Sequence, residues 1–341
     1  MRGRELFLSS LQKQPAKLPP VFLRDLTLCL DESGHSTPEV CAGDYDGRKS
    51  ALSVLALHRR LGQDAVVGCV HNMGIGIESL GGEVSFPEHG IPSIIRHPFE
   101  EIPSALPEPS AGGQTPQIAE SYRRVGEGLG DKAALVLNSE GPVTRAALLR
   151  GIENLLLDME IQPDLAAELM EFSLQSGLLY MEEIHAKSSP DCSFIAAATD
   201  NPDILGTERT MMHSMPGLKA LTRKASDLGM PTVFHPHGDF SDPRNSPLLD
   251  ASLECGISGF QFAEDNDPRR IRELLRGRTC ALGGIDAFST LLFGPEERIA
   301  RESREFLEMF QDFPGYVFMC SCSIHRGMPL SHVDALMGSL R

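Results

Sequence analysis

Short apolar runs alternate along this chain with longer segments that carry apolar residues at helical spacing. The short runs are rich in β-branched and aromatic residues and lack the strict alternation of a half-exposed strand. Near-continuous apolar runs are typical of parallel strands that are covered on both faces. We expect strands at residues 20–23, 65–70, 133–137, 193–197, 231–234, 257–262, 279–283 and 316–319.

The segments between these runs predict helices at residues 48–61, 144–176, 208–228, 268–275 and 295–310, the second of them divided near Pro163. Gly62 follows the first helix, while Pro268 and Pro295 each suit a first helical turn. Alternation of strand and helix, repeated eight times, is typical of a (β/α)8 TIM barrel. The predicted fold class is therefore α/β, as a single TIM-barrel domain over residues 1–341. An open doubly wound sheet is the alternative.

One connection is longer than the others. Residues 71–117 are rich in Gly and Pro and show no sustained period. Loops beyond about 15 residues usually serve a function or are disordered. We expect a long irregular insertion after the second strand, lying over the barrel mouth, with a short hairpin around residues 83–86. A plain surface insertion is the other interpretation.

Charge and composition narrow the possible partners. The chain has 31 Lys and Arg against 47 Asp and Glu, a formal net charge of −16. Such an acidic surface argues against nucleic acid and against anionic membranes. No apolar run approaches the roughly 20 residues of a membrane span, and no signal peptide is visible. The eight cysteines follow no disulfide framework, so we expect a cytoplasmic protein.

Metal-type ligands end two of the expected strands. His235 and His237 follow the fifth run, and Cys320 and Cys322 follow the eighth. Side chains two positions apart on a strand point to the same face. Two imidazoles and one thiolate suit zinc, and three protein ligands leave a fourth position open for chemistry. The pattern predicts a catalytic zinc site.

Further polar side chains follow other expected strands. The catalytic and substrate-binding residues of a TIM barrel lie at the carboxyl ends of its strands. We predict two catalytic carboxylates, Asp200 and Asp286. We predict substrate contacts from Arg24, His71, Asn72 and Asp239. The acidic turn at residues 264–267 supplies either a fourth zinc ligand or an acid, or is simply a solvated turn.

The order of several short motifs resembles the uroporphyrinogen decarboxylase superfamily, and within it the cobalamin-linked methyltransferase branch. These motifs are RELF at residues 4–7, LGQDAV at 61–66, EGPVT at 140–144, GGID at 283–286, and Cys322 with Pro329 seven positions later. The resemblance runs along nearly the whole chain, and it implies a TIM barrel.

The resemblance also implies a ligand set. Members of the methyltransferase branch bind zinc through His-x-Cys and a later Cys, which correspond here to His235, His237 and Cys322. Cys320 is an alternative to Cys322, although the spacing to Pro329 favours Cys322. With His237 in place of a cysteine, the site holds one thiolate and a formal charge of +1. Such a zinc is a harder Lewis acid, suited to an ether oxygen as well as to a thiol.

The implied function is zinc-dependent methyl transfer between a small methoxy compound or thiol and the cobalamin of a separate corrinoid protein. Two alternatives stay open. A metal-free decarboxylase of tetrapyrroles would use Arg24 and Asp286 as contacts, but the Arg-rich "RQAGRY" segment of those enzymes reads FLRDLTL here, at residues 22–28. The third possibility is a non-catalytic protein that binds a corrinoid or tetrapyrrole.

Overall fold

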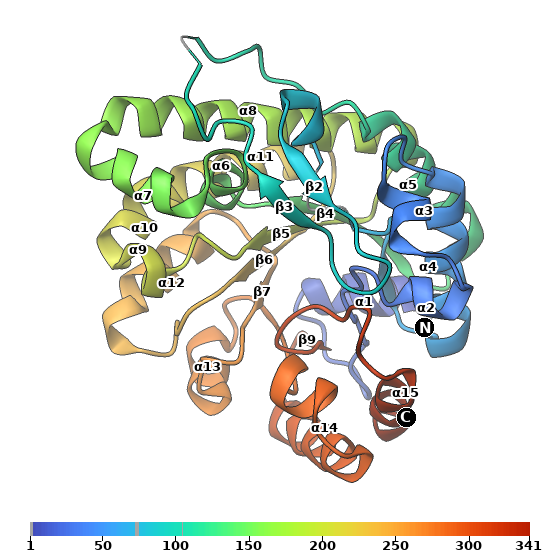
Figure 1. Cartoon of the computed structure of the whole chain (residues 1–341). Coiled ribbons are helices and arrows are strands. Elements are labelled where there is room, and N and C mark those ends of the chain that lie inside the picture. Colours follow the sequence, from blue (N-terminus) through green and yellow to red (C-terminus); the bar gives the residue numbers. More distant parts are fainter. Residues whose placement is uncertain (1–2, 72–74, 104) are drawn as a thin grey trace.

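The architecture is an α/β fold built on one parallel sheet. The structure is a computed structural model, and it describes residues 3–71, 75–103 and 105–341 (Figure 1). The seven strands of the sheet lie in the order β1-β4-β5-β6-β7-β8-β9, so each pairs with the next one along the chain. Their bounds are β1 Ala65–Val67, β4 Ala134–Glu140, β5 Cys192–Ala197, β6 Thr232–Pro236, β7 Gly259–Gln261, β8 Cys280–Gly283 and β9 Tyr316–Phe318.

Residues 20–22 lie between the first and last strands of this sheet. Phe22 N donates to Phe318 O at 3.0 Å, and Phe318 N donates to Pro20 O at 2.9 Å. On the other side, Asp64 N donates to Val21 O at 2.8 Å, immediately before β1. The sheet is therefore curled, and this segment joins its two edges. The strand expected at residues 20–23 is only an isolated bridge between Val21 and Phe318. Pro20 has no N–H to donate to a ladder, and the N–H groups of Val21 and Leu23 donate to the side chains of Asp64 and Gln63.

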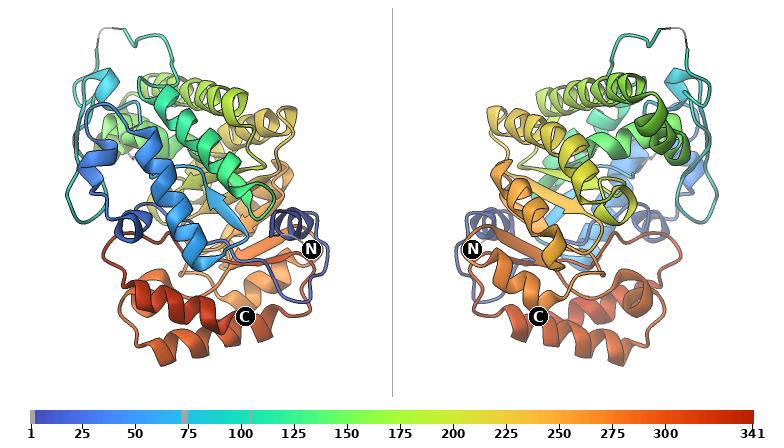
Figure 2. Two further views of the ribbon diagram at one scale, coloured as in Figure 1. Left: turned by 90° about the vertical axis from the view of Figure 1, so that its right-hand side faces the viewer. Right: turned by 90° about the vertical axis from the view of Figure 1, so that its left-hand side faces the viewer.

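Helices form an outer layer around the strands (Figure 2). Their bounds are α1 Gly3–Leu11, α2 Cys29–Ser33, α3 Thr37–Cys41, α4 Gly47–Leu61, α5 Thr115–Leu129, α6 Pro142–Arg150, α7 Ile152–Ile161, α8 Pro163–Ser188, α9 Pro202–Leu205, α10 Thr207–His213, α11 Met215–Asp227, α12 Ser246–Glu254, α13 Pro268–Leu275, α14 Glu296–Phe310 and α15 Leu330–Ser339. The helical segment expected at 144–176 divides at Gly151 as well as at Pro163. Gly151 has φ +83°, a backbone angle that favours glycine.

The long connection after β1 has some structure of its own. It contains a 3-10 turn, η1 (Glu78–Leu80), and an antiparallel hairpin of β2 (Glu83–Ser85) and β3 (Ser93–Arg96). Ile77 and Phe99 form a small apolar cluster with Leu149 of α6 and with Leu169 and Phe172 of α8. These contacts fix the connection against α6 and α8. A position over the barrel mouth stays a prediction.

An aromatic column fills the interior of the curled sheet. Phe7 of α1 lies 5.8 Å from Phe22, Phe22 lies 5.6 Å from Phe194 of β5, and Phe194 lies 5.5 Å from His235 of β6, measured between ring centroids. The apolar core thus leads from α1 directly to a polar site at the carboxyl ends of the strands. Across the described ranges, no helix is both long and apolar enough to cross a lipid bilayer.

Candidate metal centre

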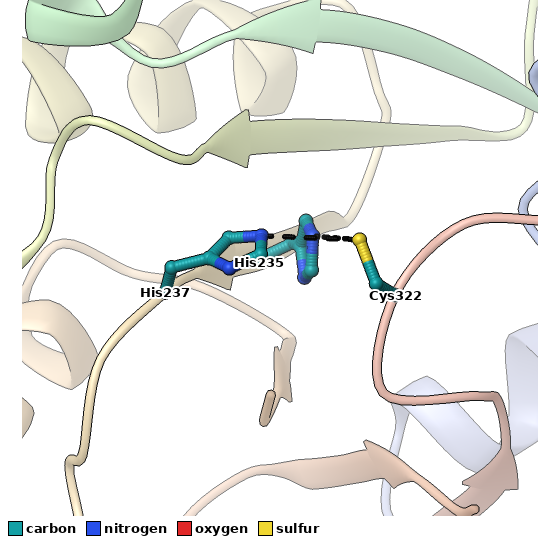
Figure 3. Close-up of side chains that lie close together, drawn as sticks. All are labelled: His235, His237 and Cys322. Carbon is teal, nitrogen blue, oxygen red and sulfur yellow. Dashed lines mark hydrogen bonds between the residues drawn. The ribbon is translucent and has the colours of Figure 1, made fainter. Parts of the chain in front are cut away.

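Three predicted metal ligands meet at one point of the fold. His235, His237 and Cys322 each direct one ligand atom to a common site, and these atoms all lie within 4.8 Å of one another (Figure 3). Cys322 Sγ lies 4.0 Å from His235 Nε2 and 3.9 Å from His237 Nε2. Tetrahedral zinc with ordinary bond lengths places such N and S atoms about 3.6 Å apart. The three side chains therefore fit a zinc ion with small adjustments.

The turn after β6 sets the position of His237. Gly238 has φ +94°, and a Cβ on it would lie 2.4 Å from Asn201 Oδ1, so glycine is required there. Asn266 holds the same turn, because its Nδ2 donates to Gly238 O at 3.0 Å and its Oδ1 accepts from Phe240 N at 2.8 Å. His237 is thereby held beside His235 and stays half-buried.

The segment after β9 carries Cys322 and is hydrogen-bonded on both sides. Ser321 N donates to Ile285 O at 2.9 Å, and Ile324 N donates to Arg24 O at 2.9 Å. Cys320 lies fully buried and outside the ligand cluster of the described residues. The rule of alternating faces does not apply to residues 320–322, because β9 ends at Phe318. Of the two cysteines, the structure brings Cys322 to the histidines.

The electrostatics of the site favour the metal-binding forms of His235 and Cys322, whereas the pKa of His237 is raised. Burial strongly lowers the pKa of His235, which keeps this imidazole neutral. Burial raises the pKa of the Cys322 thiol, but the hydrogen bond and charge of His237, together with the charge of Arg24, outweigh it and bring the pKa below its ordinary value. Burial lowers the pKa of His237, and Cys322 more than reverses this. The thiolate is the form that coordinates metals.

Gln261 is a site residue that the sequence pattern did not reveal. It is fully buried on β7, and its Oε1 contacts His235 Nδ1. Metal-binding histidines usually have such a partner on their second ring nitrogen. The one sign of Gln261 in the sequence is that it is a polar residue flanked by Phe260 and Phe262 in a run expected to be a buried strand.

Two predicted substrate contacts lie in the interior near this site. Arg24 is 6% exposed, and it donates to Asn138 Oδ1 at 2.8 Å and to Ser323 Oγ at 2.5 Å. No carboxylate of the described residues lies within ion-pair distance of Arg24. His71 Nδ1 lies 3.5 Å from Asn138 Nδ2, and burial, with a smaller contribution from Arg24, lowers the pKa of His71 to about 3. Asn72 lies outside the described residues.

The three predicted carboxylates each hold a local turn or helix start. Asp200 accepts from Val143 N at 3.2 Å and from Thr144 N at 2.9 Å at the start of α6. Asp286 accepts from Phe288 N at 2.7 Å, at the start of the π-helical turn η3 (Ala287–Leu292). Asp239 Oδ1 accepts from the N–H groups of residues 241 and 242 in the turn after His237. Catalytic and substrate-binding roles for these residues stay predictions.

The acidic turn after β7 lies toward His237. The charge of Glu264 contributes to the raised pKa of His237. Burial and the neighbouring carboxylates, Glu264 first among them, raise the pKa of Asp265. Within the described residues the ligand cluster holds no carboxylate. The turn therefore adds negative charge beside the site.

Comparison with known proteins assigns the chain to a family. The family model described as "Uroporphyrinogen decarboxylase (URO-D)" matches residues 2–341. The fold is similar to that of a methyltransferase from Methanosarcina mazei, with a TM-score of 0.85 and 23% sequence identity over 100% of this chain and 98% of that one. At this identity the likeness concerns the fold.

Curated relatives match over shorter stretches. A uroporphyrinogen decarboxylase from Magnetococcus marinus is 29% identical over 91 residues, which are 27% of this chain and 24% of that protein. One from Burkholderia mallei is 37% identical over 68 residues, 20% of this chain and 18% of that protein. The matched part thus spans less than a quarter of these relatives, whereas the family model covers nearly every residue here. The chain belongs to the uroporphyrinogen decarboxylase family.

Proposed function

We propose that this protein is a zinc-dependent methyltransferase that moves a methyl group between a small methoxy compound or thiol and the cobalamin of a separate corrinoid protein. The observation that carries the proposal is the cluster of His235, His237 and Cys322, whose ligand atoms lie within 4.8 Å of one another. The fold likeness to a methyltransferase supports it. A tetrapyrrole decarboxylase that works without metal would not need this cluster of metal-type ligands.

The chain's own residues have distinct tasks in this reaction. When bound, zinc supplies a Lewis acid to the oxygen or sulfur of the substrate. Cys322 and His237 share a proton in the metal-free site, and that proton leaves as the metal binds. His237 and Cys322 are each partly exposed, so substrate approaches from their side, whereas His235 is only 2% exposed. Arg24 places a buried positive charge near the site, which stabilises negative charge developing on the substrate heteroatom.

The ligand set favours ether substrates more than a two-thiolate set would. Two neutral imidazoles and one thiolate leave a formal charge of +1 on zinc, and Arg24 adds a second positive charge nearby. A less neutralised metal polarises an oxygen more strongly. The methyl group would pass from this oxygen to the reduced corrinoid of the partner, which supplies the electron pair of the new bond, while the oxygen keeps the pair of the broken C–O bond and takes a proton from water. In transfer to a thiol, the bound thiolate would attack the methyl group of the methylated corrinoid, and the electron pair of the broken bond would return to the corrinoid.

Tetrapyrrole decarboxylation is the second candidate, favoured by the curated relatives that carry that name and by the buried positive charge of Arg24. It requires several cationic side chains for the carboxylates of the substrate. The segment at residues 22–28 offers Arg24 alone. We therefore rank it below methyl transfer.

The first test is metal content. Purified protein, native and after chelation and zinc reconstitution under reducing conditions, is analysed for metals in the wild type, His237→Ala and Cys322→Ala. We expect about one zinc per chain in the wild type and none in either variant. Cys255→Ala is the matched control, since Cys255 is half-buried and outside the cluster, and it should keep its zinc.

Turnover is then measured with methoxy and thiol compounds in the presence of a corrinoid protein. The proposal requires methyl transfer that is lost in Cys322→Ala and retained in Cys255→Ala. A wild type that holds no zinc after reconstitution, or a Cys322→Ala variant with full zinc and full turnover, would contradict it. Release of CO2 from a porphyrinogen, unchanged in Cys322→Ala, would instead support the decarboxylase.

A further inference from the structure

The side-chain amide of Gln261 has one possible orientation. Its Nε2 donates to three backbone carbonyls: Phe262 O at 2.9 Å, Cys320 O at 3.2 Å and Ser321 O at 2.9 Å. Carbonyl oxygens accept hydrogen bonds and never donate them, so the atom that faces these three groups is the nitrogen. The other end of the amide, Oε1, must therefore be the atom that faces His235.

This orientation decides which nitrogen of His235 carries the hydrogen. Oε1 of Gln261 can only accept, so the contact with His235 requires an N–H on Nδ1. A neutral imidazole with its hydrogen on Nδ1 has its lone pair on Nε2. His235 Nε2 is the atom that lies 4.0 Å from Cys322 Sγ, within the ligand cluster.

We propose that Gln261 is a positioning residue that holds His235 in the tautomer able to bind metal through Nε2. The inference rests on the proposed zinc site and adds a residue outside the ligand set. Gln261 achieves this without charge, whereas a carboxylate at the same place would bring a negative charge toward the metal. The site thus gains an oriented ligand and keeps its formal charge of +1, the feature that suits an ether oxygen.

The carbonyl contacts explain why the orientation is stable. Cys320 and Ser321 immediately precede Cys322, and Ser321 N is itself bonded to Ile285 O. Reversing the amide would turn its oxygen toward three carbonyl oxygens and bury them unpaired, which is costly. Gln261 is therefore fixed by backbone that does not depend on metal, so the tautomer of His235 is set before metal arrives.

The test measures zinc affinity in three variants by competition with a chromophoric chelator. Gln261→Met keeps the volume but removes the acceptor for Nδ1 and the donor to the three carbonyls, and we expect zinc affinity to fall about 10- to 100-fold. Gln261→Glu restores the acceptor for Nδ1 but turns an oxygen toward the carbonyls, so we expect an affinity between that of Gln261→Met and that of the wild type. Gln63→Met is the control, because Gln63 is also a buried glutamine that accepts a backbone N–H, from Leu23 at 2.9 Å. It should keep its zinc affinity.

The absorption spectrum of the cobalt(II)-substituted protein gives a second readout, independent of turnover. Wild type and Gln261→Glu should show the intense visible bands of a tetrahedral site, and Gln261→Met should show them weakened or shifted. Equal affinity and an equal spectrum in Gln261→Met and wild type would overturn the inference while leaving the zinc site intact. So would an equal loss in Gln261→Met and Gln261→Glu. Absence of zinc from the wild type would overturn the proposed function itself.

Discussion

At the scale of single residues, His237 distinguishes this site from the His-x-Cys arrangement of the methyltransferase branch that the chain resembles. Its Nε2 reaches the common point, 3.9 Å from Cys322 Sγ, as a cysteine ligand would. The exchange replaces a negative ligand by a neutral one. In the proposed zinc site, this exchange would change the charge on the metal while leaving the number of ligands the same.

This difference predicts the effect of His237→Cys. A second thiolate lowers the formal charge of the site from +1 to zero, so we expect zinc to be retained and bound more tightly. We also expect turnover with a methyl ether to fall by at least about tenfold, since a barrier increase of about 1.4 kcal/mol has that effect. Turnover with a thiol substrate should fall less. His213→Cys, outside the cluster, is the control and should match the wild type.

One outcome for His237→Cys would contradict this prediction. If His237→Cys keeps full turnover with ethers and loses it with thiols, then the charge of the ligand set does not determine substrate preference. Both substrates are to be measured with the same corrinoid protein.

At the scale of elements, the site depends on how helices and turns begin at the carboxyl ends of the strands. Asp200 shows this at α6, where Thr144 donates both its N–H, at 2.9 Å, and its hydroxyl, at 2.7 Å, to Oδ2. A Cβ on Gly141 would lie 2.6 Å from the same oxygen. The carboxylate thus joins the end of β5 to the start of α6, the helix against which the long connection packs.

Asp200→Ala should therefore lower stability. It removes the acceptor of two buried helix N–H groups and of the Thr144 hydroxyl, so we expect the free energy of unfolding in urea to fall by about 3 kcal/mol. Asp203→Ala, an exposed carboxylate on the neighbouring α9, should change it by less than about 0.5 kcal/mol. Unchanged stability with lost turnover would instead assign Asp200 to catalysis.

The sequence allowed the elements and the ligands to be predicted to different extents. Seven of the eight expected apolar runs are strands. Strands buried on both faces need apolar residues at nearly every position, and such runs are visible in the sequence. His235 and His237 were recognisable as a ligand pair two positions apart after an apolar run, and Cys322 was chosen over Cys320 by its spacing to Pro329 in the family that the chain resembles. Gln261 was not, since its role depends on carbonyls of residues 320 and 321, which no local pattern connects to it.

At the scale of the whole molecule, the curled sheet encloses polar groups that water would otherwise solvate. Arg24, His71 and Asn138 come from three separate segments and meet inside. Burial of such groups makes the stability of the fold sensitive to pH. His71 is the most direct case, because its pKa is lowered to about 3.

The direction of this pH dependence follows from comparing His71 in the folded and in the unfolded chain. Folded protein keeps His71 neutral, whereas the unfolded chain protonates it below about pH 6.5. This contribution to stability is therefore complete above about pH 6.5 and is lost as the pH falls toward about 3. Between pH 7.5 and pH 5, we expect His71 to account for a loss of about 2 kcal/mol in the free energy of unfolding.

His71→Gln should remove that part of the pH dependence. Urea unfolding of wild type and variant is compared at pH 7.5 and pH 5, and the difference between the two pH values should be about 2 kcal/mol smaller in the variant. His89→Gln, at an exposed position in the long connection, should behave as the wild type. Identical pH dependence in His71→Gln and wild type would contradict a neutral, buried His71.

The ligands of the proposed zinc site lie far apart along the chain, since Cys322 follows His235 by 87 positions. A ribosome therefore releases both histidines well before the cysteine that completes the set. A chain that ends before residue 322 has at most two of the three ligands, and one that ends before residue 320 also lacks two of the three carbonyls that hold Gln261. Tight metal binding would then begin only once Cys322 has been made, so that a copy cut off before this residue would lose the ion to competing ligands.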